Sequence, residues 1–151
     1  MRSVLDSSIF FTDAAPEWAL FTTPSAVDEL VDLQAKCRYE NLLARGLTVR
    51  APAPGAHARV EQAARHTGDS GVISATDTDL LALALEVGAS LHTDDFAVQN
   101  VAHALGIPVV PIQQRKAAPV RWRFRCTGCG KYYRSGGDCP VCGAIIKRRL
   151  K

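Results

Sequence analysis

Residues 126–142 read Cys-Thr-Gly-Cys-Gly-Lys-Tyr-Tyr-Arg-Ser-Gly-Gly-Asp-Cys-Pro-Val-Cys, and this stretch decides how the chain is organised. It contains two Cys-x-x-Cys pairs, Cys126 with Cys129 and Cys139 with Cys142, separated by nine residues. Four thiolates at this spacing are typical of a tetrahedral metal site, most simply one structural zinc ion. The pattern therefore predicts a small zinc ribbon at the C-terminus, distinct from what the first 112 residues form.

Two other uses of these cysteines fit the same spacing. Two disulfides would suit a secreted mini-domain, but we expect a chain without a signal peptide, and disulfides are rare in reducing compartments. An iron atom in a rubredoxin-like electron-transfer site would use the same four sulfurs. Cys37 lies outside the set, in an expected helix, and is most simply a small buried hydrophobic residue.

Charge divides the 151-residue chain at the same place. Residues 1–112 carry 7 Lys and Arg against 14 Asp and Glu, whereas residues 113–151 carry 11 Lys and Arg and a single acid, Asp138. This asymmetry indicates a basic module that meets a polyanion and an acidic body with another task. The alternative is a solvated basic tail. We expect a first domain over 1–112, a linker over 113–120 and the ribbon over 121–151.

Hydropathy places limits on the class of protein. Hydrophobic residues make up 47% of the chain, which is ample for a packed core. No apolar run reaches the roughly 20 residues that a membrane-spanning helix needs. We therefore expect a cytoplasmic protein without a membrane partner.

Short apolar runs alternate with helical patterns along the first domain. Four runs are expected strands: residues 3–5, 47–50, 89–92 and 107–111. The prolines of the last run favour the edge of a sheet. Four helices are expected: 23–44, 57–66, 74–87 and 96–105. The alternation is typical of an α/β fold with a parallel sheet and helices on both faces.

Acidic side chains stand where expected strands end and helices begin. Asp6 closes the first strand, Asp77 lies in the first turn of a helix, and Asp94 and Asp95 follow the third strand. In a parallel sheet these positions meet at one edge, and Glu29 in the first helix would add a fourth carboxylate. Gathered acids repel one another unless a cation lies among them, and Mg²⁺ and Mn²⁺ prefer oxygen ligands. The set therefore predicts a divalent metal site suited to phosphodiester chemistry.

Each of these acids also has a simpler interpretation. Asp77 would only cap its helix, Asp94 or Asp95 would be the N-cap of the next helix, and Glu29 would be a solvated helix charge. Asp6 is harder to explain in this way, because an acid that closes an apolar strand tends to face the edge of the sheet. The metal-site hypothesis rests on the set and not on any single member.

The order of these segments resembles a PIN-domain ribonuclease. The matching stretches are Val4-Leu-Asp6-Ser-Ser8, Glu29 in a helix that Thr-Pro initiates, Ser74-Ala-Thr-Asp-Thr-Asp-Leu-Leu-Ala-Leu-Ala84 and Thr93-Asp-Asp-Phe96. The run Asp95-Phe-Ala-Val-Gln-Asn100-Val followed by a four-cysteine ribbon is more specific. With it, nearly the whole chain is similar to the archaeal and eukaryotic endonuclease that matures the 3′ end of small-subunit ribosomal RNA. The chain lacks the long insertions of the eukaryotic forms, which favours an archaeal type.

This resemblance implies a single-strand endoribonuclease that depends on Mg²⁺ or Mn²⁺. Asp6, Glu29, Asp77 and Asp95 would be the catalytic acids that bind one or two ions, with Asp94 as an alternative in the last pair. We expect in-line attack of water on the scissile phosphorus, which leaves a 5′-phosphate and a 3′-hydroxyl. The implied substrate is precursor small-subunit rRNA in a pre-ribosomal particle, with ribosome-assembly proteins as candidate partners.

Affinity for RNA is expected to come from the basic C-terminus, because an acidic site repels RNA. Arg121-Trp-Arg-Phe-Arg125 alternates cations with aromatic residues, so in a strand the arginines share one face and Trp122 and Phe124 the other. The arginines would hold phosphates, whereas the two rings would pack on the ribbon or the body, or stack on bases. The candidate RNA-binding residues are Arg121, Arg123, Arg125, Lys131, Arg134, Lys147, Arg148 and Arg149.

Two other functions remain open from the sequence. A non-catalytic ribosome-assembly module would bind rRNA through the ribbon and keep a degenerate nuclease fold, although all four acids are present. A toxin-type PIN ribonuclease would share the acidic pattern but would not account for the ribbon.

Overall fold

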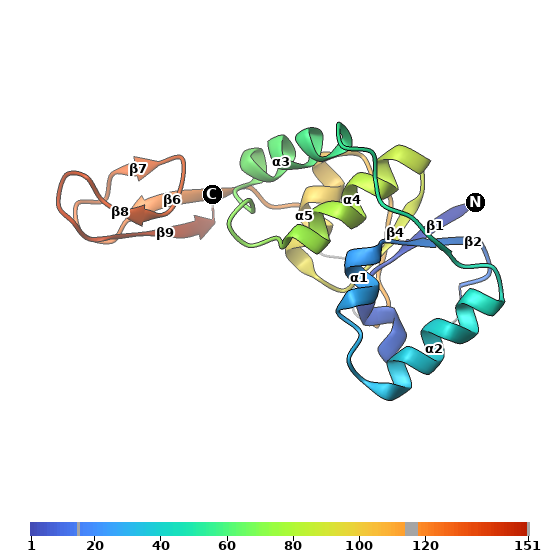
Figure 1. Cartoon of the computed structure of the whole chain (residues 1–151). Coiled ribbons are helices and arrows are strands. Elements are labelled where there is room, and N and C mark those ends of the chain that lie inside the picture. Colours follow the sequence, from blue (N-terminus) through green and yellow to red (C-terminus); the bar gives the residue numbers. More distant parts are fainter. Residues whose placement is uncertain (15, 114–117, 151) are drawn as a thin grey trace.

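The computed structural model of the chain describes residues 1–14, 16–113 and 118–150 (Figure 1). An α/β body holds a parallel sheet in the order β3-β2-β1-β4-β5, and a ribbon holds an antiparallel sheet in the order β7-β6-β9-β8. This confirms the predicted fold class. Residues 114–117 of the expected linker lie outside the described residues.

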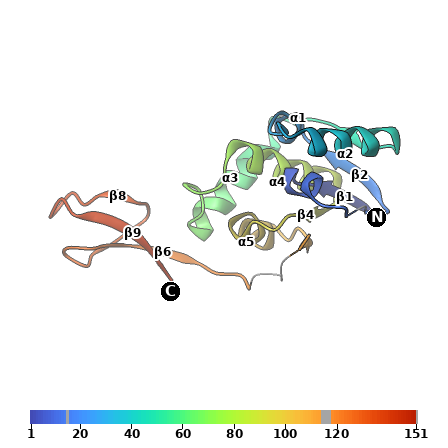
Figure 2. The ribbon, with the colours of Figure 1, turned by 90° about the horizontal axis from the view of Figure 1, so that it is seen from below.

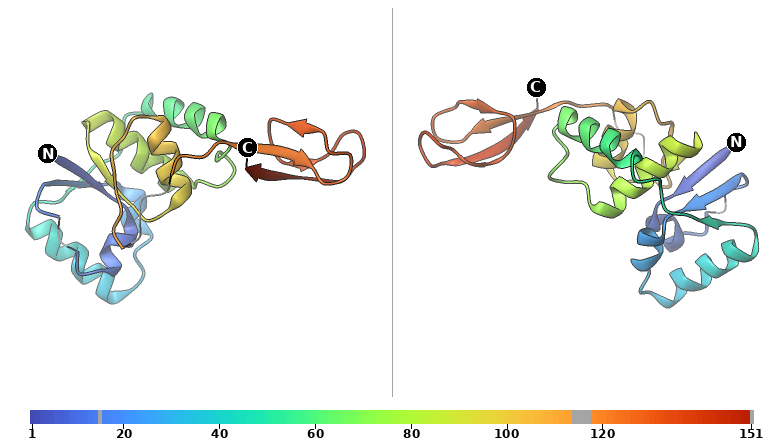
Figure 3. Two further views of the ribbon diagram at one scale, coloured as in Figure 1. Left: turned by 180° about the vertical axis from the view of Figure 1, so that it is seen from behind. Right: turned by 45° about the horizontal axis from the view of Figure 1, so that its top comes forward.

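The elements follow one another in the alternation expected of an α/β fold. The strands of the body are β1 (Arg2–Leu5), β2 (Ala19–Thr22), β3 (Thr48–Val49), β4 (Ser90–His92) and β5 (Val109–Val110). Its helices are η1 (Ser7–Phe11), α1 (Pro24–Asp28), α2 (Leu33–Ala44), α3 (Ala56–Thr67), α4 (Ala75–Val87) and α5 (Phe96–Ala104). The ribbon strands are β6 (Trp122–Cys126), β7 (Tyr132–Tyr133), β8 (Gly137–Asp138) and β9 (Ile145–Leu150). In Figures 2 and 3 the ribbon projects from the body beside α3.

Helices cover both faces of the body sheet. Successive residues of β1 point to opposite faces, so neighbouring residues of this strand pack in different cores. Val4 packs in a core with buried residues of α3, α4 and α5, whereas Leu5 packs in a second core with η1 and α2. Strand β5 lies at the edge of the sheet, as the prolines of its segment predict. None of the helices in the described part of the chain is long and apolar enough to cross a membrane.

The single helix expected over residues 23–44 is wrong, because the chain breaks between α1 and α2. Thr23 caps α1 as expected, but the helix ends at Asp28. Asp32 then starts α2 by accepting a 3.0 Å hydrogen bond from the Ala35 N–H, and an aspartate that caps a new helix competes with continuing the old one. The break leaves Glu29 at the C-cap of α1, instead of in a second turn.

Strand β2 is not among the predicted elements, and it gives the sheet five strands instead of four. Ala19–Thr22 pairs in parallel with β1 on one side and β3 on the other. Its apolar run is short and directly precedes Thr23-Pro24, so periodicity alone does not separate it from the approach to a helix. The expectation for Cys37 is also wrong, since its side chain is exposed on α2.

Candidate active site and metal centre

Asp6 lies where the central strand β1 ends, at the carboxyl edge of the sheet. Its carboxylate accepts hydrogen bonds from Thr93 Oγ1 at 2.7 Å and from the hydroxyls of Ser7 and Ser8 at 3.3 Å each. Burial raises the pKa of Asp6, and these hydrogen bonds only partly oppose the effect. A carboxylate that is oriented by three hydroxyls and is costly to ionise alone suits a cation ligand.

Asp77 and Asp95 reach the same edge from the N-termini of α4 and α5. Asp77 accepts a 2.7 Å hydrogen bond from the Ser74 N–H in a capping box, and Asp95 accepts two N–H groups of the first turn of α5. The helix-capping interpretation of both residues is therefore correct. Burial raises the pKa of Asp77, and the charges of Asp95 and Asp6 raise it further. The charges of Asp6 and Asp95 therefore act on Asp77, while Asp77 and Asp95 also cap their own helices.

Glu29 and Asp94 differ in how they relate to this group. Ser7 Oγ lies 3.3 Å from Asp6 Oδ1 and 3.2 Å from Glu29 Oε2, so this hydroxyl links the exposed Glu29 to Asp6. Asp94 instead accepts the backbone N–H groups of Ile112 at 2.8 Å and Gln113 at 3.1 Å, and so fixes the chain that follows β5. The charge of Asp95 contributes to the raised pKa of Asp77.

The candidate acids at this edge offer the kind of ligand that a hard divalent cation prefers. The four carboxylates lie after β1, at the C-cap of α1, in the first turn of α4 and at the N-cap of α5, and offer only oxygen ligands: Asp6, Glu29, Asp77 and Asp95. The repulsion that Asp6 and Asp95 exert on Asp77 would be relieved by an ion such as Mg²⁺ or Mn²⁺, which prefers carboxylate oxygen to nitrogen or sulfur.

A second acidic residue of α4 serves the packing of the body. Asp79 accepts a 2.6 Å hydrogen bond from Ser25 Oγ, and its other oxygen lies 2.6 Å from His57 Nε2. These contacts tie α4 to α1 and α3, beside the site that Asp77 enters. The sequence pattern misses this role because the two partners lie 54 and 22 residues away.

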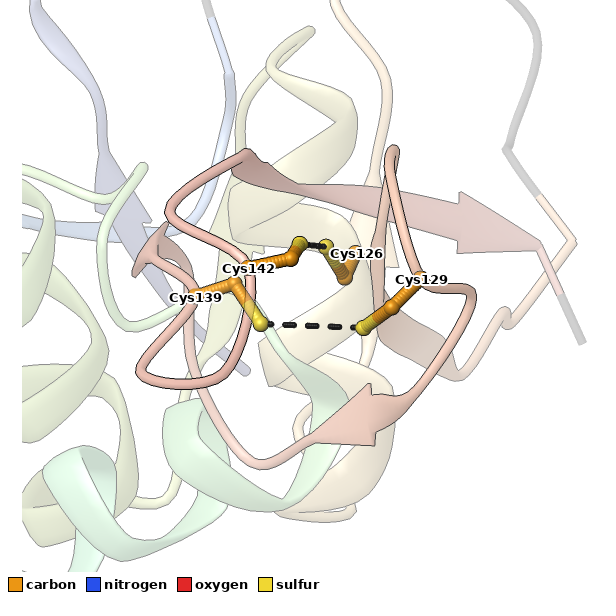
Figure 4. Close-up of side chains that lie close together, drawn as sticks. All are labelled: Cys126, Cys129, Cys139 and Cys142. Atoms are coloured by element: carbon orange, nitrogen blue, oxygen red, sulfur yellow. Dashed lines mark hydrogen bonds between the residues drawn. The ribbon is translucent and has the colours of Figure 1, made fainter.

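The four cysteines of the ribbon converge on one point (Figure 4). Their sulfur atoms all lie within 4.8 Å of one another: Cys126, Cys129, Cys139 and Cys142. The shortest separation, 3.3 Å between Cys126 and Cys142, is far beyond the roughly 2.05 Å of a disulfide. A 2.9 Å hydrogen bond with the Tyr133 hydroxyl lowers the pKa of Cys139 to about 6, which favours the thiolate. A cluster of soft thiolates fits zinc.

A buried ion pair joins the ribbon to the body, and we call it the latch. Asp69, directly after α3, has a side chain that is 1% exposed and lies 2.8 Å from Arg148 Nη1 of β9. Asn100 Nδ2 donates to the other Asp69 oxygen at 2.6 Å, and its own oxygen accepts the Val120 N–H at 2.8 Å. The Arg148 guanidinium also lies 4.3 Å from the Trp122 ring centroid. Arg148, a predicted RNA-binding residue, is therefore engaged with the body.

No local sequence pattern predicts this latch. Asp69 stands within Gly68-Asp-Ser-Gly71, which is typical of an exposed turn, and its partner Arg148 is 79 residues away. Asn100 was singled out only by the family resemblance. The burial of Asp69 can be recognised only once the position of β9, which carries Arg148, is known.

The alternation predicted for residues 121–125 is confirmed, and it builds a cationic face on the ribbon. Arg123 and Arg125 are exposed, whereas Trp122 and Phe124 are half-buried. The antiparallel register sets Arg149 opposite Arg123 and Lys147 opposite Arg125. Like charges directly opposite each other destabilise a sheet, so this face costs stability that a polyanion would restore. The other predicted cations are also exposed: Arg121, Lys131 and Arg134.

The chain is similar to known ribonucleases. The chain matches the family model for the PIN domain of ribonuclease over residues 4–87. It is 36% identical to the endoribonuclease Nob1 of Pyrococcus abyssi over 97% of this chain and 92% of that protein. It is 29% identical to the 20S-pre-rRNA D-site endonuclease NOB1 of Saccharomyces cerevisiae over 64% of this chain and 22% of that protein.

A solved structure supports the fold of the body. A PilT N-terminus domain protein of Sulfolobus solfataricus P2 superposes with a TM-score of 0.50, at 18% identity over 78% of this chain and 99% of that one. The match to the Pyrococcus protein extends through the ribbon as well as the body. The chain therefore belongs to the PIN-domain endoribonucleases of the Nob1 family.

Proposed function

We propose that this protein is a divalent-metal-dependent endoribonuclease that cuts single-stranded precursor small-subunit rRNA at its 3′ end. Membership of the family makes it an endoribonuclease, and the substrate is suggested by the activity for which the yeast relative is named. The observation that carries the proposal is the placement of three acids at one edge of the sheet: Asp6 follows β1 and accepts a hydrogen bond from Thr93 after β4, while Asp77 and Asp95 lie at the N-termini of α4 and α5.

In this proposal Asp6, Glu29, Asp77 and Asp95 hold one or two Mg²⁺ or Mn²⁺ ions. A bound ion supplies Lewis acidity toward the scissile phosphate and lowers the pKa of an attacking water. Asp6 is the fixed ligand, because three hydroxyls set its orientation. Glu29 is exposed and joins the group through Ser7, which suits a ligand that reaches the ion through water.

The proposal divides the work between the two parts of the chain. Residues 1–112 form the nuclease, 113–120 the linker, and 121–151 a ribbon whose cysteines hold one zinc ion. The cationic face of Arg123, Arg125, Lys147 and Arg149 contacts RNA phosphates, which offsets the net negative charge of the nuclease part. A non-catalytic module has no use for the acid group, since these charges destabilise one another without a cation.

The test compares Asp6→Asn with Asp13→Asn on a labelled single-stranded RNA that spans the rRNA 3′ end, in Mn²⁺. Asp13 pairs with Arg38, and its side chain is 96% exposed, so it controls for loss of one surface charge. We expect Asp6→Asn to slow cleavage by at least about hundredfold, while binding of the RNA stays unchanged. Equal cleavage by the two variants, or a parallel loss of binding and cleavage in Asp6→Asn, would contradict the proposal.

A further inference from the structure

A groove of about 860 Å³ runs between the C-terminal end of α3 and the ribbon strands β6 and β7. We call it the junction groove. The body contributes Arg65, His66, Gly68 and Ser70, and the ribbon contributes residues 121–124 and 132–135. Its volume lies within the roughly 300–1,000 Å³ typical of small-ligand sites, so it has room for a short nucleotide segment but not for a duplex.

The junction groove exists because Gly68 lets the ribbon approach the body closely. A Cβ at this position would lie 2.7 Å from Trp122 Cβ and 3.2 Å from the Trp122 carbonyl oxygen. Gly68 also takes a φ of +84° as the C-cap of α3, which other residues rarely adopt. Together with the latch, this contact sets the distance between the two walls.

The charge of the junction groove fits a polyanion. Four arginines line it, Arg65 from the body and Arg121, Arg123 and Arg134 from the ribbon. Among the described residues that line it there is no Asp or Glu. The nearby Asp69 adds no free negative charge to the wall, because its buried carboxylate is paired with Arg148.

The junction groove also offers aromatic surface beside these cations. Tyr132 is 60% exposed, and the guanidinium carbons of Arg123 and Arg125 lie 5.8 and 5.7 Å from the centroid of its ring. Trp122 contributes a further ring to the wall. Exposed aromatic rings among cations are typical of surfaces that hold single-stranded nucleic acid, where bases stack and phosphates are neutralised.

The junction groove is connected to the acidic site by one short loop. Residues 68–74 leave α3, pass Ser70 in the groove wall and lead to Asp77 in the first turn of α4. Two hydrogen bonds brace this loop, from the Val72 and Ile73 N–H groups to the Asp69 carbonyl. Figure 1 shows the loop on the side of the body that faces the ribbon.

We propose that the junction groove binds the unpaired RNA segment that flanks the scissile phosphate. Phosphates contact Arg65 and Arg134, and a base stacks against Tyr132. The inference rests on the proposed function as an RNA endonuclease, and adds a binding site that α3 of the body shares with the ribbon. RNA would therefore bind at the junction groove as well as at the cationic face.

The first measurement uses Trp122 as a reporter inside the junction groove. The chain has two tryptophans, so Trp18→Phe leaves Trp122 as the only one. The zinc-loaded full chain is titrated with a short single-stranded oligoribonucleotide without other divalent ions, so that the RNA stays intact. We expect quenching of Trp122 emission that saturates with the same Kd as fluorescence anisotropy of the labelled RNA.

The second measurement compares two arginines of α3. Arg65→Gln should weaken binding about three- to fivefold and flatten the log–log salt dependence by about 0.7, the share of one phosphate contact on a single strand. Arg59→Gln, exposed on the same helix but outside the groove, should leave both unchanged. Tyr132→Leu should weaken binding by about tenfold, because stacking on one base is lost.

The outcomes separate this inference from the proposed function. If the RNA binds and is cut normally but Trp122 emission stays constant and Arg65→Gln matches Arg59→Gln, the junction groove is not the RNA site. Quenching by polyglutamate but not by RNA would also overturn it, in favour of an acidic protein partner. If the wild-type chain neither binds nor cuts single-stranded RNA, the proposed function fails as well.

Discussion

Asp6 and Asp77 lower the stability of the fold when no cation is bound. Burial raises the pKa of both carboxyls above the unfolded value of about 3.9. At neutral pH the folded chain therefore carries ionised groups that favour the unfolded state. This penalty shrinks as the pH falls through the folded pKa, and it is gone below the unfolded pKa. A cation bound beside these carboxylates would offset this loss of stability, as expected of a cation-binding site.

Thermal unfolding of zinc-loaded protein tests this directly. Without added Mg²⁺ or Mn²⁺, Asp6→Asn should unfold at a higher temperature than the wild type at neutral pH, because the amide removes the buried charge. Added Mn²⁺ should raise the melting temperature of the wild type and not that of Asp6→Asn. A variant that is less stable without Mn²⁺, or that Mn²⁺ stabilises equally, would show that Asp6 is not a cation ligand.

Arg148 and Arg149 are neighbours on β9 with different surroundings, and they make a matched pair. Arg148 belongs to the latch, whereas Arg149 is exposed on the cationic face. Arg148→Met leaves the Asp69 carboxylate buried without its cation, a loss of roughly 3–5 kcal/mol if the ribbon stays docked. We expect the ribbon to detach instead, because water can then reach Asp69.

Detachment by Arg148→Met would be seen as a red shift of Trp122 emission in the Trp18→Phe background and as a larger radius of gyration in X-ray scattering. Arg149→Met should change neither quantity. An Arg148→Met protein with unchanged emission and size would mean that the latch does not hold the ribbon.

At the scale of elements, the sequence predicts what local chemistry determines. The Ser74 to Asp77 capping box and Gly88, at a φ of +64°, bound α4 where the pattern places them. Local sequence signals do not predict the features that depend on contacts between residues far apart in the sequence. Strand β2 is defined by pairing with β1 and β3, and the latch by an acid and a cation that are far apart in sequence. The positions of the candidate acids at element ends can be predicted from the sequence, whereas the junction groove depends on the packing of the ribbon against α3.

Gly68 and Gly88 test whether the close approach of two elements matters. Both are left-handed C-caps, but a Cβ at Gly68 would strike Trp122, while a Cβ at Gly88 would meet nothing within 4 Å. Alanine at either position should destabilise the body by about 1–2 kcal/mol in urea unfolding, because both strain the backbone. Only Gly68→Ala should also shift Trp122 emission and weaken binding of single-stranded RNA. Identical behaviour of the two variants would contradict a ribbon that is docked at α3.

The ribbon is too small to be held by its own core, which has three buried residues: Cys126, Cys139 and Ile146. Zinc bound by four cysteines would supply roughly 10 kcal/mol or more of folding free energy. We expect one zinc per chain by elemental analysis, and its loss in Cys139→Ser should unfold β6 to β9 while α1 to α5 remain. Cys37→Ser, at the exposed fifth cysteine, should keep the metal. Iron in place of zinc, or a ribbon still resistant to protease in Cys139→Ser, would contradict this account.

At the scale of the whole molecule, the two parts solve opposite electrostatic problems. In the proposed function, an acidic edge that gathers divalent cations also repels RNA, and the basic ribbon supplies the attraction for RNA. The latch and Gly68 hold the parts in contact, so that RNA bound as proposed at the ribbon and the junction groove would lie beside the loop of residues 68–74, which leads to Asp77 in α4. Specific cutting then depends on both parts acting on one RNA.

The most direct test is incubation of the full zinc-loaded chain with a precursor of small-subunit rRNA that extends beyond its mature 3′ end, followed by mapping of the cut. We predict a single Mn²⁺-dependent cut that produces the mature 3′ end, carries a 5′-phosphate on the released fragment, and is absent with Asp6→Asn. Cleavage at many single-stranded positions with equal efficiency, or the same cut by Asp6→Asn, would contradict the assigned substrate or the assigned active site, respectively.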